Sequence, residues 1–394
     1  MTLVEALGGW NSAVVLAGAT ALGVAAGTVG TFMLLRKRSL VSDALSHATL
    51  PGIAIAFLVG LALGVEGRSL PLLLAGAAAS GIVGVLAIQA ISRHTRLPED
   101  AAIGAVLSVF FGLGVVLLSY IQSLPTGGQA GIKTFILGQT AAMRAPEAAA
   151  LGLLALVAVA AVLLFFKELR LLAFDQGFAR VQGWPAGRID LLLMALVTLV
   201  TVVGLQTVGL ILIIALLITP AAAARFWTDR LGVMTAISAA IGGLAGGIGA
   251  HLSARFADLP AGAVIVLVAA ALFVLSFLFA PARGVVARSV RHLALRLRVA
   301  EGTGLADLAA GRGAPPPLLG RWLSLRGLLR RGAAGWEPTD RGRTVAAAAR
   351  RNRLLWDRFL ERHAALVPAT ADWGLAPIDR VLPPDLVREL EANP

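Results

Sequence analysis

Long apolar stretches restrict the fold of this chain more than any other feature of its sequence. Inside a bilayer, backbone N–H and C=O groups must be paired within the protein, which leaves helices and closed barrels as the only spanning structures. Nine stretches are apolar enough and long enough to cross about 30 Å of hydrocarbon as helices. They are residues 11–35, 40–65, 69–92, 101–121, 146–166, 190–204, 206–224, 231–252 and 261–280. The sequence therefore predicts an all-α, polytopic transmembrane bundle of about nine spans.

Composition divides the chain into two parts. With 58% hydrophobic and 14% charged residues among 394, it is typical of a membrane protein and not of a soluble enzyme. Up to about residue 280 almost all charged residues are clustered in short connections, and beyond it they are evenly spread. We expect a transmembrane domain at 1–282 and a polar extension at 283–394. Gly and Ala recur in the spans, and because small residues let helices approach closely, the bundle should be tightly packed.

Basic residues predict which way the chain crosses the membrane. Lys and Arg are enriched in cytoplasmic loops, and with nine spans every basic cluster falls on one side. The N-terminus is then external and the polar extension cytoplasmic. The net charge of +12 could suggest nucleic-acid binding in a soluble protein, but in the membrane half this bias explains it. The clusters are Arg36 to Arg38, Arg93 and Arg96, Lys167 to Arg188, Arg225 and Arg230, and Arg283 and Arg288.

Asp43 and His47 are the polar residues that most need an explanation. Four residues apart on a helix, they share one face, and a charged side chain near the bilayer centre costs roughly 2.5–3.5 kcal/mol on insertion scales. Such a pair could form an interhelical hydrogen bond, a proton relay or a metal site. His251, the other histidine in the spans, is expected at the external interface.

A metal would need more donors than one such pair provides. Two copies of the pair meeting about a twofold axis would form an Asp₂His₂ site. Its mixed oxygen and nitrogen ligands suit manganese, zinc or iron. The chain has no cysteine, so thiolate metal sites are excluded.

A second informative stretch lies in the connection between residues 167 and 188. Asp175 can cap a short helix, Gly183 can end it and Pro185 can open the next element. We expect either a lever on which another protein pushes or an interfacial helix without a partner. The apolar side chains that could dock are Phe174, Phe178, Val181 and Trp184.

The run RSLVSDALSHATLPG at residues 38–52 resembles the signature of the permease subunits of metal-ion ABC importers, the manganese, zinc and iron class. Further stretches resemble that family in the same order along the chain, at residues 99–104, 204–209 and 217–232. The similarity covers about residues 10 to 282.

The resemblance implies a transport subunit, not an enzyme, in the bacterial cytoplasmic membrane. Two permeases, as a homo- or heterodimer, would form the pathway, two cytoplasmic ATPase subunits would drive it, and an external metal-binding protein would deliver the ion. The divalent ion is then cargo moved by alternating access, not a permanently bound cofactor. Because the chain has no G-x-x-x-x-G-K-[ST] run to cradle nucleotide phosphates, ATP hydrolysis requires a separate subunit.

The same resemblance assigns roles to individual residues. Asp43 and His47 match the family's intramembrane metal-coordinating positions. The coupling helix, through which the ATPase moves the permease, matches the stretch that contains Asp175, Phe178, Arg180, Gly183 and Trp184.

The polar extension resembles a second family. Residues 281–300 read as a basic helix near anionic lipid headgroups. Residues 336–343, followed by an expected helix at 344–365, resemble the wing and following helix of diphtheria-toxin-repressor-type regulators, and the likeness covers about 302–393. Asn352 and Arg380 stand where those repressors typically carry His, so the predicted domain is degenerate and winged-helix-like.

This extension is expected to contact the ATPase, the membrane or its own copy, and nucleic acid is not expected as a partner. The main alternative is a membrane-tethered, metal-responsive DNA-binding regulator. An intramembrane metalloprotease is disfavoured because the chain has no H-E-x-x-H pair.

Overall fold

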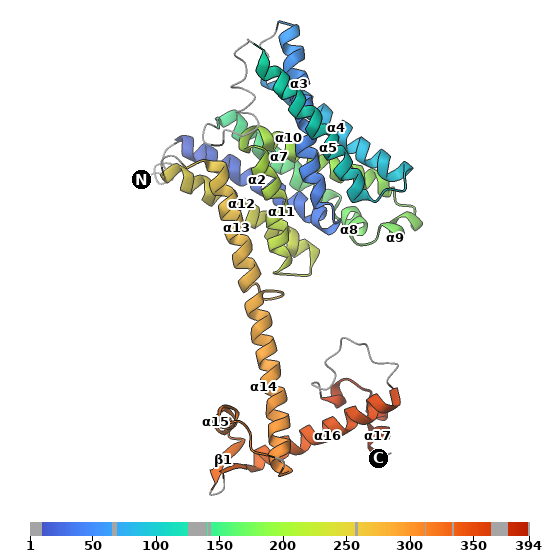
Figure 1. The fold of residues 1–394 in the computed structure, drawn as a ribbon, viewed down its shortest axis with the longest axis vertical. Helices are drawn as coiled ribbons and strands as arrows, with labels where there is room; N and C mark the ends of the chain where they lie inside the picture. Colours follow the sequence, from blue (N-terminus) through green and yellow to red (C-terminus); the bar gives the residue numbers. More distant parts are fainter. Residues whose placement is uncertain are drawn as a thin grey trace. The chain divides into compact units, whose positions relative to one another are not determined.

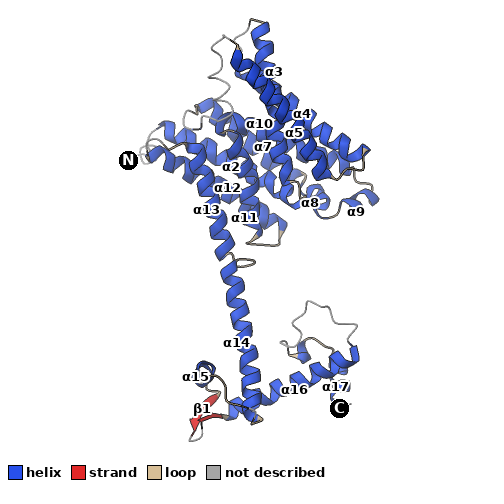
Figure 2. Ribbon diagram, viewed as in Figure 1, coloured by secondary structure: helices blue, strands red, loops and turns tan. Residues whose placement is uncertain are grey.

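The computed structural model describes residues 10–64, 69–124, 140, 143–256, 259–311, 313–332, 335–363 and 377–392. The chain forms two compact units, Met1–Ala287 and Arg288–Pro394. In the described residues of the first unit all regular structure is helical (Figure 2). Its helices are α2 (Trp10–Leu35), α3 (Ser39–Ala62), α4 (Leu70–His94), α5 (Glu99–Ser123), α7 (Ala145–Leu164), α8 (Phe166–Phe174), α9 (Gln176–Val181), α10 (Ala186–Val208), α11 (Leu210–Arg225), α12 (Leu231–Arg255) and α13 (Ala261–Phe279).

Eight of these helices are long and apolar enough to cross a membrane, namely α2, α3, α4, α5, α7, α10, α12 and α13. The apolar part of α11, Leu212–Arg225, is shorter. The predicted polytopic helical bundle is therefore confirmed, with eight span-length helices in the described part of the chain where the sequence predicted nine spans.

The boundary between α10 and α11 differs from the prediction. The sequence placed the boundary at Leu205, with Gly204, Gln206, Thr207 and Gly209 as the residues of the turn. In the structure α10 continues to Val208 and the chain breaks at Gly209, the last of those four residues. Gly209 has φ +83°, a conformation that only glycine adopts at low cost. Gly204 serves packing instead, because a Cβ there would lie 2.6 Å from Ile213 Cδ1 of α11.

Glycines hold the bundle together, as the sequence predicted. α2 and α12 lie side by side (Figure 1), and a Cβ added at Gly23 would overlap the carbonyl of Gly242. One turn further along α2, a Cβ at Gly27 would overlap the carbonyl of Ser238, whose hydroxyl donates a 2.6 Å hydrogen bond to the Gly27 carbonyl. Lipid gives no hydrophobic drive for helices to associate, so such close backbone contact is what stabilises the pairing.

The second unit combines helices with one hairpin (orange to red in Figure 1). It contains most of α14 (Val285–Ala309), then α15 (Pro317–Leu325), β1 (Leu329–Gly332), β2 (Gly335–Pro338), α16 (Asp340–His363), the 3₁₀ turn η4 (Ile378–Arg380) and α17 (Pro384–Ala392). β1 and β2 pair antiparallel, with Leu329 opposite Pro338 and Gly332 opposite Gly335. One small core forms around Leu323 and Leu329, another around Trp356 and Phe359.

Two predictions for the extension change in detail. The basic helix begins at Val285, not residue 281, and runs on to Ala309. The helix expected at 344–365 already begins at Asp340, inside the segment predicted to be a wing. A small hairpin followed by a helix is present, but the winged-helix character of this unit stays a prediction.

We expect Gly27→Val to destabilise the bundle, because the added methyl groups cannot fit against the Ser238 carbonyl. Overpacking of this kind costs about 1–3 kcal/mol. Thermal unfolding of the purified protein in detergent measures the loss. Gly112→Val is the matched control, since a Cβ at Gly112 meets nothing within 4 Å; equal melting temperatures for the two variants would contradict the packing argument.

Candidate functional site

The helix α3 brings Asp43 and His47 together. They lie one turn apart, and His47 Nε2 is 3.4 Å from Asp43 Oδ1. Their side chains are 22% (His47) and 38% (Asp43) exposed in the single chain. The predicted side-by-side geometry is therefore present, and both groups keep surface that this chain alone does not cover.

The surroundings of the pair are mostly apolar. The imidazole of His47 meets the ring of Phe111 on α5 edge to face, with centroids 4.8 Å apart. On the neighbouring face of α3, Ser42 and Ser46 are fully buried, and the Ser46 hydroxyl donates a hydrogen bond to the carbonyl of Ser42. α3 thus packs its serine face inward and leaves the Asp43–His47 face only partly covered.

One chain supplies too few donors for a metal site. In the part of the chain that the structure describes, no group of three or more His, Asp or Glu side chains could hold an ion together. Asp43 offers carboxylate oxygens, and the buried Nδ1 of His47 has no hydrogen-bond partner among the described residues. Structural and catalytic metal sites use three or more protein ligands, so Asp43 and His47 alone are fewer donors than such a site uses.

The segment after α8 forms the expected short helix. Asp175 caps α9, accepting a 2.8 Å hydrogen bond from the backbone N–H of Phe178. Gly183, with φ +79°, reverses the chain after it, and α10 begins directly after Pro185. α8 and α9 follow one another at one edge of the unit (Figure 1). Apolar side chains of this segment are exposed, namely Phe174, Phe178, Val181 and Trp184.

A buried ion cluster lies beside these helices, and the sequence analysis missed it. Asp190, on α10, has a side chain only 6% exposed, and its Oδ1 accepts hydrogen bonds from Arg36 (3.2 Å) and Arg38 (2.6 Å). Arg38 also pairs with Glu99, at the start of α5. The sequence signal for it is only an acidic residue in the first turns of an apolar span. Arg36 and Arg38 are also part of a topology signal, and Arg38 begins the run that resembles the permease signature.

The two arginines of this cluster are permanently charged. Burial lowers the pKa of the Arg36 guanidinium from its ordinary value. Burial also acts to lower the pKa of Arg38, but Asp190 and Glu99 outweigh it and the pKa ends above its ordinary value. Because an arginine pKa starts above about 12, both side chains remain cations at any physiological pH.

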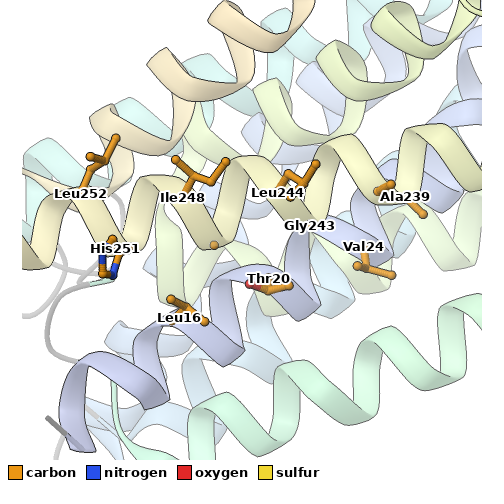
Figure 3. Close-up of a pocket in the computed structure, with 11 residues that line it drawn as sticks. Leu16, Thr20, Val24, Ala239, Gly243, Leu244, Ile248, His251 and Leu252 are labelled. Carbon is orange, nitrogen blue, oxygen red and sulfur yellow. The ribbon is translucent and has the colours of Figure 1, made fainter. Parts of the chain in front are cut away.

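His251 belongs to a different place in the bundle. It lines an apolar groove of about 750 Å³ with residues of α2 and α12, such as Leu16, Thr20 and Ile248 (Figure 3). No residue of α3 lines this groove, so His251 does not share a cavity with Asp43 and His47.

Comparison with known proteins gives consistent matches. The profile of the ABC 3 transport family matches residues 12–280. The manganese transport system membrane protein MntC of Bacillus subtilis is 43% identical over 288 residues, which cover 73% of this chain and 65% of that protein. The zinc transport system membrane protein TroC of Treponema pallidum is 42% identical over 288 residues, covering 73% of this chain and 95% of that protein.

A solved structure agrees with the sequence relatives. PsaBC from Streptococcus pneumoniae, in complex with a Fab, superposes with a TM-score of 0.58 and 33% identity, covering 68% of this chain and 91% of that chain. The profile match ends at residue 280, so the predicted likeness of the extension to metal-dependent repressors has no support from it. A match over residues 12–280 to one profile, together with relatives above 40% identity, shows that this chain belongs to the ABC 3 transport family.

Proposed function

We propose that this chain is the transmembrane permease subunit of an ATP-driven importer of divalent transition-metal ions. The observation that carries the proposal is the Asp43–His47 pair, 3.4 Å apart and partly exposed on a span-length helix. A carboxylate and an imidazole are hard and borderline donors, which suit manganese, zinc or iron. The relatives named for manganese and zinc transport support the same range of cargo.

The ion would be bound between two permeases. One chain offers Asp43 and His47, and a second copy or a similar partner doubles the donors to four. Two half-sites meeting about a twofold axis are the usual way for a symmetric dimer to build one central site. Neither half-site holds an ion by itself, so binding weakens when the two chains separate. Alternating access follows if the helices rock about this site and expose it first outside, then inside.

The energy would come from two cytoplasmic ATPase subunits, with an external metal-binding protein delivering the ion. α9 is the proposed contact with the ATPase, formed by Asp175, Phe178, Arg180, Gly183 and Trp184. The exposed aromatic rings of Phe178 and Trp184 support this role, because aromatic side chains are enriched at protein interfaces. The turn at Gly183 joins α9 to α10, so a push on α9 would reach α10 through this short connection.

The orientation supports a ninth crossing by α11. Arg188 lies at the start of α10 and Arg225 at the end of α11, so each of the two helices has a basic cluster at the end away from the Gly209 break. Positive charges favour the cytoplasmic side, so α10 would cross outward and α11 back. The N-terminus is then external and the extension cytoplasmic, in a multi-pass protein of the bacterial inner membrane.

The extension is proposed to contact the membrane, the ATPase or its own copy. The exposed side chains of Arg288, Arg296 and Arg298 on α14 suit anionic lipid headgroups. A metal-responsive DNA-binding role is not proposed, because Asn352 accepts a 2.7 Å hydrogen bond from the Ile378 N–H where the repressors carry a His.

Asp43→Ala is expected to lower metal uptake by at least about tenfold, because it removes one donor from each half-site. Uptake of ⁵⁴Mn²⁺ or ⁶⁵Zn²⁺ by proteoliposomes that contain the whole transporter measures this, with assembly checked by gel filtration. Asp385→Ala in the extension, where the carboxylate is 88% exposed, is the control. Uptake by Asp43→Ala at the control's level would contradict the proposed site.

Replacing Gly183 by Val and Trp184 by Ala together is expected to uncouple ATP hydrolysis from transport. A β-branched residue cannot adopt φ +79° without strain, and the alanine removes an exposed ring at the proposed contact. The ratio of ions transported to ATP hydrolysed is the measurement. Leu325→Ala, at an exposed apolar position in the extension, should keep the normal ratio; a normal ratio in the double variant would reject the coupling role.

Truncation after Val285 is expected to leave metal binding intact, because the proposed permease domain ends at residue 282 and Asp43 and His47 lie far upstream. Isothermal titration of the truncated dimer with Mn²⁺ and Zn²⁺, beside the full-length dimer, tests this. A loss of binding would show that the extension contributes to the site.

A further inference from the structure

The turn between α2 and α3 carries an ion cluster with no role in the site described so far. Arg36 and Arg38 flank Lys37, which has φ +57°, a strained conformation for a residue with a side chain. This turn exposes Lys37 and lets both arginines reach the same oxygen of Asp190. Backbone strain of this kind persists only where the surrounding structure requires it.

The cluster reaches the segment proposed to contact the ATPase. Nη1 of Arg36 donates to the carbonyl of Leu172 on α8 at 3.3 Å and to the side chain of Gln176, the first residue of α9, at 3.4 Å. The same guanidinium contacts Asp190 through Nη2. One side chain therefore touches α8, α9 and α10 at once.

The cluster also reaches the helix that carries the proposed metal ligands. Arg38 directly precedes α3, and Asp43 follows five residues later, about 7–8 Å along a stiff helix. Arg38 is bound on two sides, by Asp190 on α10 and Glu99 on α5. A displacement of Asp190 or Arg36 must therefore move the first turn of α3 or break a buried ion pair.

Stability alone explains this cluster poorly. Burying charges costs desolvation energy, and well-packed apolar residues are often as stabilising as a buried ion pair. The two arginines and two carboxylates balance in charge, and separating Arg36 from Asp190 leaves the largely buried guanidinium of Arg36 without a carboxylate partner. Such a cluster favours discrete arrangements over gradual deformation, which suits an element that switches between two states.

We propose that Arg36, Arg38 and Asp190 are positioning residues that carry movement of α9 to α3, and so to Asp43 and His47. This inference rests on the proposed function, since it takes α9 as the contact with the ATPase and α3 as the metal helix. None of the three residues touches the ion. They affect how strongly ATP hydrolysis is coupled to movement of Asp43 and His47.

The test uses the whole transporter, with its ATPase subunits and external binding protein, in proteoliposomes. Asp190→Asn keeps the side chain's shape and removes its charge. We expect the number of ions moved per ATP to fall by about tenfold, within the usual range of coupling between sites, while ATP hydrolysis and metal binding to the resting complex stay near wild type. Asp190→Glu should restore most of the coupling ratio. Arg343→Gln, which removes an exposed ion pair with Asp340, is the control.

A second variant and a second readout separate transmission from stability. Arg36→Gln should give the same uncoupling, because it detaches α8 and α9 while Arg38 keeps its pairs with Asp190 and Glu99. The chain has no cysteine, so Ile55→Cys, at an exposed position on α3, accepts a single spin label. We expect its ATP-dependent spectral change to disappear in Asp190→Asn although ATP is still hydrolysed.

The outcomes are distinct. If the wild-type complex moves no divalent metal, the proposed function fails. If the wild type transports and both variants keep its coupling ratio, the function stands and the transmission role is overturned. If neither variant assembles with the ATPase, the cluster serves stability and the proposal is likewise overturned.

Discussion

Pairing of polar groups in a medium without water is the constraint on which the rest of this structure depends. It makes the spanning segments helical, and it lets helices gain contact mainly by close approach, as between Gly23 and Gly242. Most polar side chains in the bundle meet this constraint with a hydrogen bond to the backbone of their own helix. Ser46, for example, bonds to a carbonyl of its own helix. Asp43 and His47 instead pair with each other, and the buried Nδ1 of His47 has no hydrogen-bond partner within the described part of the chain.

Sequence reasoning succeeded where the cause is local. The helical repeat alone places Asp43 beside His47, and the capping preference of Asp175 marks the start of α9. It was less specific at the end of α10, where Gly204, Gln206, Thr207 and Gly209 together suggested a turn about Leu205, because the break at φ +83° requires a glycine and two glycines were present. Packing against Ile213 decided which one.

The ion cluster could not be predicted from the sequence in the same way. Asp190 and Arg38 are separated by 152 positions, and neither neighbourhood carries a periodic pattern that names the other. The arginine run already had a sufficient explanation in the positive-inside bias. The extension shows a similar limit: its helices follow from apolar periodicity, whereas the hydrogen bond from Ile378 to Asn352 joins segments 26 residues apart.

In the proposed transporter, the ion cluster and the Asp43–His47 pair would meet two separate requirements that a single site could not meet together. A transit site must bind an ion and release it, which favours few donors with uncovered surface, as at Asp43 and His47. A group that transmits movement must instead hold its neighbours firmly. An unpaired carboxylate in such a group, near the pathway, would compete with Asp43 and His47 for the transported cation. Asp190 avoids this because two guanidinium groups neutralise it. Under the proposed function, the force that moves the ion thus passes through charges that have no affinity left for it.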